Sequence, residues 1–269
     1  MYRLIYLWLL TLVIGYACNA QTDRVLIHSH NDYEHESPFY DAYAQRVFSI
    51  EADVFALADG RLLVGHDRSH LTDGRTLEYL YITPIVESFE AHGGRAWRGS
   101  DDRFVLLIDL KTPAETTLNH VVRLVAAYPH VFDSEVNPLA VQVVISGDMP
   151  PPSAFDGYPS YISFDGRVSV DYTPDQLARV EFISAPLANY VKEWNGKGAL
   201  TGWDREQVSQ AIDHAHRLGK KIRFWGTPDG PNAWDTLHQM GVDIINTDRV
   251  ERCAAHFSVA HGSARKPLR

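Results

Sequence analysis

The stretch that decides the fold is Phe104-Val105-Leu106-Leu107-Ile108-Asp109-Leu110-Lys111, together with Thr112-Pro113-Ala114-Glu115, which follows it directly. The first stretch is a short and nearly continuous apolar run, which is typical of a β-strand covered on both faces. The second places a cap residue, a proline at the first helical position and a capping-box glutamate in register, so it predicts a helix start. Together they predict one strand followed at once by one helix.

Similar strand–helix units follow one another between residues 21 and 261. Thr173-Pro174-Asp175-Gln176 repeats the helix-start chemistry, and Asp204 with Gln207 predicts a further helix start. The Asp59-Gly60 pair predicts a hairpin turn before an extra short strand over Arg61–Gly65. The other strands are expected at Val25–His28, Ser49–Val54, Phe104–Leu110, Val141–Ser146, Tyr161–Phe164, Val180–Ser184, Ile222–Trp225 and Asp243–Asn246.

Strands that alternate with helices over about 250 residues predict an α/β fold, a single-domain (β/α)8 TIM barrel. A doubly wound open sheet is the alternative, but the first strand lacks the Gly-rich loop of dinucleotide-binding sheets. Of the 269 residues, 45% are hydrophobic, which is enough for a large core. The net charge of −9 opposes nucleic-acid binding, because phosphate backbones bind basic surfaces.

The two ends of the chain are expected to lie outside the barrel. Residues 1–20 are predicted to be a signal peptide, because Leu4–Ala17 is mostly apolar but shorter than the roughly 20 residues that cross a bilayer. Cleavage after Ala20 would give a secreted or periplasmic protein, whereas lipid attachment at Cys18 would give an anchored lipoprotein. Residues 262–269 are expected to be a disordered tail.

Charged side chains gather at the C-terminal ends of the first strand units, where barrel enzymes carry their active sites. The first strand ends in His28-Ser29-His30, and the second contains Glu51-Ala52-Asp53. The extra strand is followed by His66-Asp67, and the third ends in Asp109-Leu110-Lys111. Because side chains alternate between the faces of a strand, the two acids of the second strand must share a face.

Carboxylates on one face of an otherwise apolar strand are costly unless something pairs with them. A divalent cation, Mg²⁺ or Ca²⁺, is a suitable partner, because hard cations take carboxylate oxygens. We therefore predict that Glu51, Asp53 and Asp109 are metal ligands. Two histidines beside such a site suit phosphodiester chemistry, in which one takes a proton from the attacking hydroxyl and the other gives one to the leaving oxygen. Lys111 would add a positive charge for a phosphate oxygen.

In the order and spacing of these residues, the chain resembles the phospholipase-C-like phosphodiesterase superfamily, which includes glycerophosphodiester phosphodiesterases and spider-venom sphingomyelinase D. The resemblance extends from His28 to Asp248. The local match His28-Ser29-His30-Asn31-Asp32-Tyr33 is typical of the branch that includes the fungal altered-inheritance-of-mitochondria group. The resemblance implies a phosphoric diester hydrolase that acts on a small phosphodiester or a lipid headgroup with the help of a divalent cation.

The resemblance also implies a role for individual residues. It identifies His28 and His66 as the catalytic pair, Glu51, Asp53 and Asp109 as the metal ligands, Lys111 as a phosphate contact and Trp225 as a pocket residue. One departure is that glycerophosphodiesterases usually have His-Arg-Gly on the first strand. Two alternatives follow for His30: it replaces that arginine as a phosphate contact, or it is the catalytic residue with His28 as its support.

Two further interpretations remain open at the level of sequence. A His-x-His at the end of the first strand also begins the zinc site of amidohydrolase-type barrels, with His28 and His30 as ligands. That class needs histidines at later strand ends, and none occurs around Tyr161–Asp165 or Phe182–Ala185. The other alternative is a non-catalytic exported barrel that binds a phosphorylated ligand. Hydrolysis and release of a cyclic phosphate are both compatible with the predicted residues.

Overall fold

The computed structural model describes residues 24–263, so the predicted signal peptide, Cys18 and residues 264–269 lie outside the described residues. The last helix, α8, runs from Val250 to Ser263 and thus reaches the first two residues of the segment expected to be a tail. None of the helices in the described part of the chain is long and apolar enough to cross a membrane.

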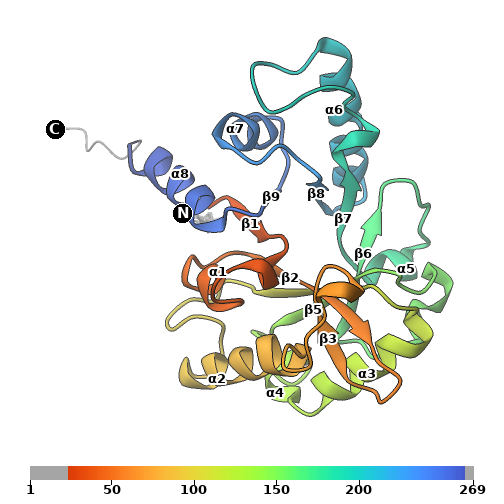
Figure 1. The fold of residues 1–269 in the computed structure, drawn as a ribbon. Coiled ribbons are helices and arrows are strands. Elements are labelled where there is room, and N and C mark those ends of the chain that lie inside the picture. The colour runs from red at the N-terminus through yellow and green to blue at the C-terminus, as the bar shows by residue number, and fades with distance from the viewer. Residues whose placement is uncertain (1–23, 264–269) are drawn as a thin grey trace, which may run out of the picture.

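A closed barrel of parallel strands forms the centre of the molecule (Figure 1). The strands pair in the order β1-β9-β8-β7-β6-β5-β4-β2, and β2 pairs with β1 to close the ring. β3 pairs antiparallel with β2 outside the ring. The strands are β1 (Leu26–Ser29), β2 (Ser49–Ala56), β3 (Leu62–Val64), β4 (Val105–Leu110), β5 (Gln142–Gly147), β6 (Ile162–Arg167), β7 (Val180–Pro186), β8 (Lys221–Trp225) and β9 (Ile244–Thr247).

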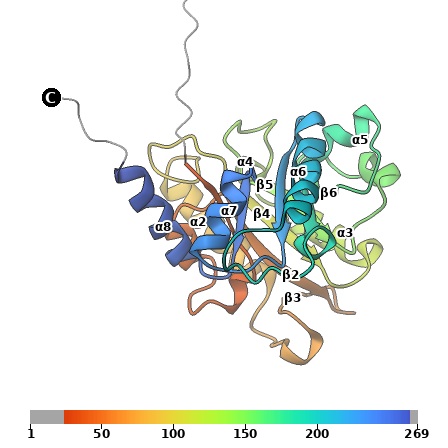
Figure 2. The same cartoon turned by 90° about the horizontal axis from the view of Figure 1, so that it is seen from above.

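Helices surround the barrel, and the view from above shows them on its outer side (Figure 2). The α-helices are α1 (Tyr40–Ala44), α2 (Thr83–Ala91), α3 (Ala114–Ala126), α4 (Pro129–Phe132), α5 (Pro174–Ala178), α6 (Gly202–Arg217), α7 (Pro231–Gln239) and α8. Shorter helical segments are η1 (Asp32–Glu34), η2 (Arg68–His70), η3 (Glu78–Ile82), η4 (Pro152–Gly157) and η5 (Leu187–Asn189). The predicted TIM barrel is confirmed, and each predicted strand overlaps one observed strand.

Two of the three predicted helix starts are wrong in detail. Thr112 does not cap α3, because its hydroxyl contacts Thr117 Oγ1 at 2.7 Å and accepts a bond from the Ala56 amide at 2.9 Å. The threonine therefore ties the β4–α3 turn to the end of β2. α6 starts before Asp204, because Thr201 is its cap and accepts from the Asp204 amide at 3.1 Å. The capping box at Thr173 is present as predicted.

The core has two layers, which follow from the alternation of side chains along each strand. In β4, the outward residues Leu106, Ile108 and Leu110 belong to the large apolar layer between barrel and helices. The inward residues Val105 and Leu107 belong to a smaller apolar cluster inside the barrel. Asp109 comes next in this inward series, so the barrel interior changes from apolar to acidic along the strand.

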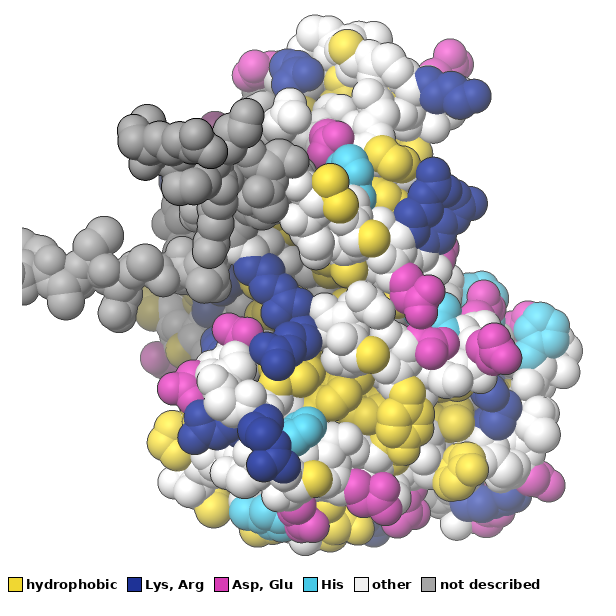
Figure 3. Space-filling view, turned by 90° about the vertical axis from the view of Figure 1, so that its left-hand side faces the viewer, with side chains coloured by type: hydrophobic (Ala, Val, Ile, Leu, Met, Phe, Trp, Pro, Cys, Tyr) yellow, Lys and Arg dark blue, Asp and Glu magenta, His cyan; other side chains and the backbone are white. Residues whose placement is uncertain are grey.

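The outer surface carries charges of both signs. On the face shown in Figure 3, acidic, basic and histidine side chains alternate with small hydrophobic areas. The acidic excess of the chain is therefore not gathered in one patch on this face.

Candidate active site

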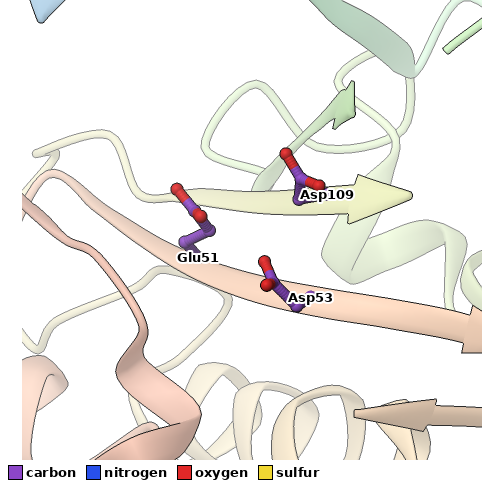
Figure 4. A group of neighbouring side chains, drawn as sticks. All are labelled: Glu51, Asp53 and Asp109. Atoms are coloured by element: carbon purple, nitrogen blue, oxygen red, sulfur yellow. The ribbon is translucent and has the colours of Figure 1, made fainter. Parts of the chain in front are cut away.

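Three carboxylates meet at the C-terminal end of the barrel, on the neighbouring strands β2 and β4. The register pairs Asp53 directly with Asp109, and it pairs Glu51 with Leu107. The three acidic side chains point toward one another from the two strands (Figure 4), and one oxygen of each lies within 4.8 Å of the others. The shared face predicted for Glu51 and Asp53 is therefore present in the structure.

Gly147, at the end of the adjacent strand β5, makes room for this cluster. Its φ of +71° lies in the left-handed region, and a Cβ atom there would come within 2.4 Å of the Leu110 carbonyl oxygen and 2.5 Å of Asp109 Oδ1. Only glycine relieves both the backbone strain and the collision. The position of Asp109 thus depends on a glycine in the next strand.

Lys111 bridges the two aspartates, whereas Glu51 is held by His28 and Arg223. Lys111 Nζ lies 3.0 Å from Asp53 Oδ2 and 2.8 Å from Asp109 Oδ1. His28 Nε2 and Arg223 Nη1 both contact Glu51 Oε2, at 2.8 and 3.0 Å. Asp53 Oδ1 is buried and has no hydrogen-bond partner among the described residues. This orphaned oxygen faces a cluster with more negative than positive charge.

The pKa values of the acids reflect this crowding. Burial and the charge of Glu51 raise the pKa of Asp53 to about 6, although Lys111 opposes them. The same two causes raise the pKa of Asp109. Burial also acts on Glu51, but its hydrogen bond with His28 and the charge of Arg223 outweigh burial and hold its pKa well below the usual range. Glu51 is therefore ionised, whereas the two aspartates lack full compensation for their charge.

His28 lies inside the barrel wall and not at its open end. Its side chain is 0% exposed, and both ring nitrogens are engaged, Nδ1 with Ser49 Oγ at 2.7 Å and Nε2 with Glu51. Arg223 Nη1 approaches the same Nε2 to 2.5 Å. Burial and the charge of Arg223 lower the pKa of His28 to about 4, so the imidazole is neutral at physiological pH. Its contacts connect β1, β2 and β8.

His30 follows β1 and reaches the open end of the barrel. Its Nδ1 lies 2.6 Å from Asp248 Oδ1, and its Nε2 lies 3.8 Å from Glu51 Oε1. Burial lowers the pKa of His30, but the hydrogen bond with Asp248 and the charge of Glu51 outweigh it and leave the pKa above its ordinary value. His28 and His30 therefore approach the two different oxygens of Glu51.

His66 stands at the other end of the carboxylate cluster, in the loop after β3. Its side chain is 58% exposed, and its Nδ1 lies 3.6 Å from Asp53 Oδ2. The Tyr33 hydroxyl lies 3.2 Å from the same nitrogen. The cluster thus has a partly exposed histidine beside Glu51 and another beside Asp53.

Trp225 ends β8, two residues after Arg223, and is 42% exposed at the rim of the barrel. Among the described residues, hydrogen bonds and ion pairs connect His28, His30, His66 and Lys111 to the carboxylate cluster, but not Trp225. A cavity of about 400 Å³ beside Trp225 is lined by residues of the neighbouring loops, among them Val191, Trp194 and Pro228. The structure therefore places Trp225 at the rim, next to a cavity and apart from the acids.

Comparisons with known proteins agree with this geometry. Residues 18–150 match the model of the AIM6-like phosphodiesterase domain. This part of the chain is therefore similar to the AIM6-like phosphodiesterase domain. Residues 221–251, which include β8 and β9, match the model of the glycerophosphoryl diester phosphodiesterase family. The resemblance predicted from the sequence is thereby confirmed.

Curated proteins similar to this chain match most of its length. Altered inheritance of mitochondria protein 6 of Eremothecium gossypii is 29% identical over 272 residues, which span 84% of this chain and 67% of that protein. The homolog from Arthroderma benhamiae is 28% identical over 263 residues, which span 86% of this chain and 83% of the homolog.

Solved structures are similar in fold. A glycerophosphodiester phosphodiesterase from Parabacteroides distasonis superposes with a TM-score of 0.56 at 14% identity, over 90% of this chain and 98% of that one. An Oleispira antarctica phosphodiesterase, solved in complex with the product sn-glycerol-3-phosphate, gives a TM-score of 0.52 at 14% identity, over 87% and 96% of the two chains. At this identity the likeness establishes the fold and not the substrate.

Several residues of this site were not singled out as functional from the sequence. They are Tyr33 in η1, Asp165, Ser184 and Arg223 within β6, β7 and β8, Asn246 in β9, and Asp248 directly after β9. A signal for Arg223 did exist, because it is a charged residue in the middle of the apolar run Ile222–Trp225 and shares a face with Trp225. Tyr33 and Asp248 belong to the stretches that carry the resemblance, but their contacts with His66 and His30 connect residues that lie 33 and 218 positions apart in the sequence.

Proposed function

We propose that this chain is a metal-dependent phosphodiesterase that acts on a small phosphodiester or a phospholipid-type headgroup, with His30 and His66 as its acid–base pair. One observation carries the proposal. Three carboxylates converge within 4.8 Å, one of them with a buried oxygen that lacks a partner, and a partly exposed histidine stands beside two of the three. The three carboxylates and both histidines lie in residues 18–150, the part of the chain that matches a phosphodiesterase domain model.

The donor set fits a hard divalent cation, Mg²⁺ or Ca²⁺. Asp53 Oδ1 has no partner in the described part of the chain, and the ion pairs of Lys111 involve the other oxygen of this residue. Glu51 and Asp109 would complete the ligand set with their carboxylates. A cation held there would neutralise charge on the phosphoryl oxygens of a bound phosphodiester.

Geometry favours His30 over His28 as the proton-transferring residue of the first strand. A general acid or base must come within hydrogen-bond reach of the group whose proton it moves. His28 has no exposed surface, and both of its ring nitrogens are engaged inside the protein. His30 is partly exposed, and Asp248 binds its Nδ1, which leaves Nε2 for a substrate. We therefore assign His28 a supporting role, which was the alternative open at the level of sequence.

The remaining predicted residues fit this proposal. His30, held by Asp248, and His66 would move protons between the attacking hydroxyl and the leaving oxygen of the phosphodiester. Lys111 would place its ammonium group beside the metal ligands, where it can also meet a phosphate oxygen. Trp225 would contact the organic part of the substrate at the rim.

The zinc-hydrolase alternative fits the geometry less well. It needs His28 and His30 on one metal ion, but the guanidinium group of Arg223 contacts His28 Nε2, where that ion would have to bind. A zinc ion at this position would lie against the positive charge of Arg223 in a buried environment, where the two charges would repel each other strongly. The inward residues Asp165 on β6 and Ser184 on β7 also replace the further histidines that such a site requires.

A screen of purified protein would test the function. Glycerophosphodiesters, lysophospholipids and inositol lipids would be supplied with Mg²⁺ or Ca²⁺, and products followed by ³¹P NMR. We expect a phosphomonoester or a cyclic phosphate from one class, lost with EDTA and restored by the metal. Binding of these compounds without turnover under any condition would contradict the proposal and favour the non-catalytic barrel.

We also propose that the chain is exported, either secreted or periplasmic, or anchored to a membrane through lipid at Cys18. The support is the apolar stretch Leu4–Ala17. Mass spectrometry of the mature N-terminus distinguishes cleavage after Ala20 from lipid attachment. An intact Met1 on cytoplasmic protein would contradict both routes.

A further inference from the structure

The Tyr33 side chain connects three polar groups at the proposed active site. Tyr33 is buried, and its hydroxyl lies 2.8 Å from Asp53 Oδ2, 2.8 Å from Asn31 Oδ1 and 3.2 Å from His66 Nδ1. It is therefore in contact with both a proposed metal ligand and a proposed proton-transferring histidine.

The phenol has a single proton to donate, and this restricts what His66 can do. The oxygens of Asp53 and Asn31 accept hydrogen bonds only, and both are closer to the hydroxyl than the histidine nitrogen is. The phenolic proton therefore goes to one of these two oxygens. The phenolic oxygen keeps lone pairs toward His66, so a hydrogen bond between the two residues requires the proton to sit on His66 Nδ1.

The negative charge near His66 has the same effect. Asp53 Oδ2 lies 3.6 Å from His66 Nδ1, so an N–H group at that nitrogen points toward a carboxylate, whereas a bare lone pair would face it. The hydrogen bond that one ring nitrogen makes determines which tautomer is present. Both neighbours of Nδ1 thus select the same tautomer.

We propose that Tyr33 is a positioning residue that holds His66 as the Nδ1–H tautomer and leaves Nε2 as the nitrogen that exchanges protons with the substrate. The tautomer assignment stands on the contacts alone, whereas its consequence for turnover rests on the proposed function. His66 needs such a partner, because its side chain is 58% exposed and would otherwise favour the Nε2–H form that a free histidine adopts in water.

The loop around Tyr33 is built to keep the hydroxyl in place. Asn31 adopts a left-handed conformation with φ of +48°. Asp32 is fully buried and accepts hydrogen bonds from Ser29 Oγ at 2.9 Å, the Phe39 amide at 2.6 Å and the Tyr81 hydroxyl at 3.0 Å. A carboxylate that accepts several hydrogen bonds fixes the backbone of its loop, so the backbone that carries the Tyr33 ring is held rigidly.

Nitrogen NMR of the full chain with bound Mg²⁺ tests the tautomer directly. Long-range ¹H–¹⁵N spectra, recorded at about pH 8, distinguish the two tautomers of a neutral histidine. The His66 signals are identified by their absence in His66→Gln. We expect the Nδ1–H pattern in the wild type and a change toward Nε2–H in Tyr33→Phe, which removes only the hydroxyl.

Tyr81→Phe is the matched control, because it removes another buried hydroxyl, one that lies in η3 and contacts Asp32 next to Tyr33 but not His66. His66 should keep the Nδ1–H pattern in this variant. An Nε2–H pattern in the wild type, an unchanged pattern in Tyr33→Phe, or an equal change in both variants would overturn the proposal.

Kinetic measurements then distinguish a failure of the role proposed for Tyr33 from a failure of the proposed phosphodiesterase function. Loss of a residue that orients an active-site group typically costs about 10–100-fold in activity, and we expect this loss in kcat of Tyr33→Phe with KM little changed. A tautomer change without any turnover in the wild type would support the role of Tyr33 and contradict the phosphodiesterase. A tautomer change with unaltered kcat would overturn the assignment of Nε2 as the working nitrogen.

Discussion

The open end of the barrel has two sectors with opposite charge balance. In the sector of β2 and β4, Lys111 pairs with both Asp53 and Asp109, and the third carboxylate, Glu51, pairs with Arg223 from β8. In the sector of β6 and β8, the carboxylate of Asp165 faces two guanidinium groups, at 3.0 Å from Arg167 and 3.3 Å from Arg223. Both sectors are largely buried and both point inward.

The sector of β2 and β4 therefore needs a bound cation to balance its charge, whereas the sector of β6 and β8 does not. Arg223 is also the link between the sectors, because it contacts Glu51 and Asp165 with different nitrogens and Ser184 with a third. A buried charge without a counter-charge is costly, so an acidic sector of this kind is stable when a cation binds. In the balanced sector, Asp165 has two guanidinium counter-charges, although its Oδ1 is buried without a hydrogen-bond partner among the described residues, and Arg223 can hold Glu51 in place.

The largest expected effect is on proton transfer in the acidic sector. His30→Ala and His66→Ala should each lower kcat by about 10²–10⁴-fold, the usual contribution of a general acid or base, while Mg²⁺ binding persists. Steady-state kinetics and isothermal titration measure the two quantities. His28→Ala should instead lower the midpoint of chemical denaturation, since the proposed role of His28 is to hold Glu51 in position. Near wild-type turnover in His30→Ala, with loss in a stably folded His28→Ala, would restore His28 as the catalytic residue.

The next effect concerns the link between the sectors. Arg223→Met leaves Glu51 and Asp165 as buried carboxylates without this partner, and loss of one member of a buried pair typically costs about 3–5 kcal/mol of the free energy of unfolding. Urea denaturation measures it. Arg167→Met is the control, because Arg167 binds the same Asp165 from a 30% exposed position and should cost about 1 kcal/mol or less. Equal losses in both variants would show that the two sectors do not differ as described.

The smallest effect distinguishes the sectors by their response to a cation. Mg²⁺ at a hundredfold excess over its dissociation constant should stabilise the wild type by about 2.7 kcal/mol. Asp53→Asn should lose most of this gain, because the variant removes one of the three carboxylates that lie within 4.8 Å of one another. Asp165→Asn should keep it, since Asp165 lies in the balanced sector. Thermal unfolding with Mg²⁺ or EDTA gives the comparison, and a gain retained in Asp53→Asn would reject the metal site.

The barrel was predicted from local patterns in the sequence. Apolar runs such as Val105–Ile108 and turn residues such as Asp59-Gly60 reflect interactions between residues close in sequence, and the strands lie where these patterns predict them. Helix starts failed where a tertiary contact changed the local preference. Thr112, a good cap in isolation, instead binds Thr117 and the end of β2.

The same distinction applies to the site. Alternation along a strand was sufficient to place Glu51 and Asp53 on one face, and the common end of parallel strands was sufficient to add Asp109 and Lys111. The exposure of a histidine, however, is a property of the closed barrel. His28 and His30 are two residues apart in one motif, yet one is fully buried and the other reaches the open end.

By itself, the sequence determined the strand–helix alternation, the closed parallel barrel and the acidic cluster at one end of it, because these follow from periodicity and from the geometry of neighbouring strands. The tertiary structure alone decided which polar groups pair across the barrel. Arg223 and Asp248 meet histidines that precede them by 195 and 218 residues, respectively. Such contacts leave no local periodic signal, since they exist only after β8 and β9 have closed the barrel against β1.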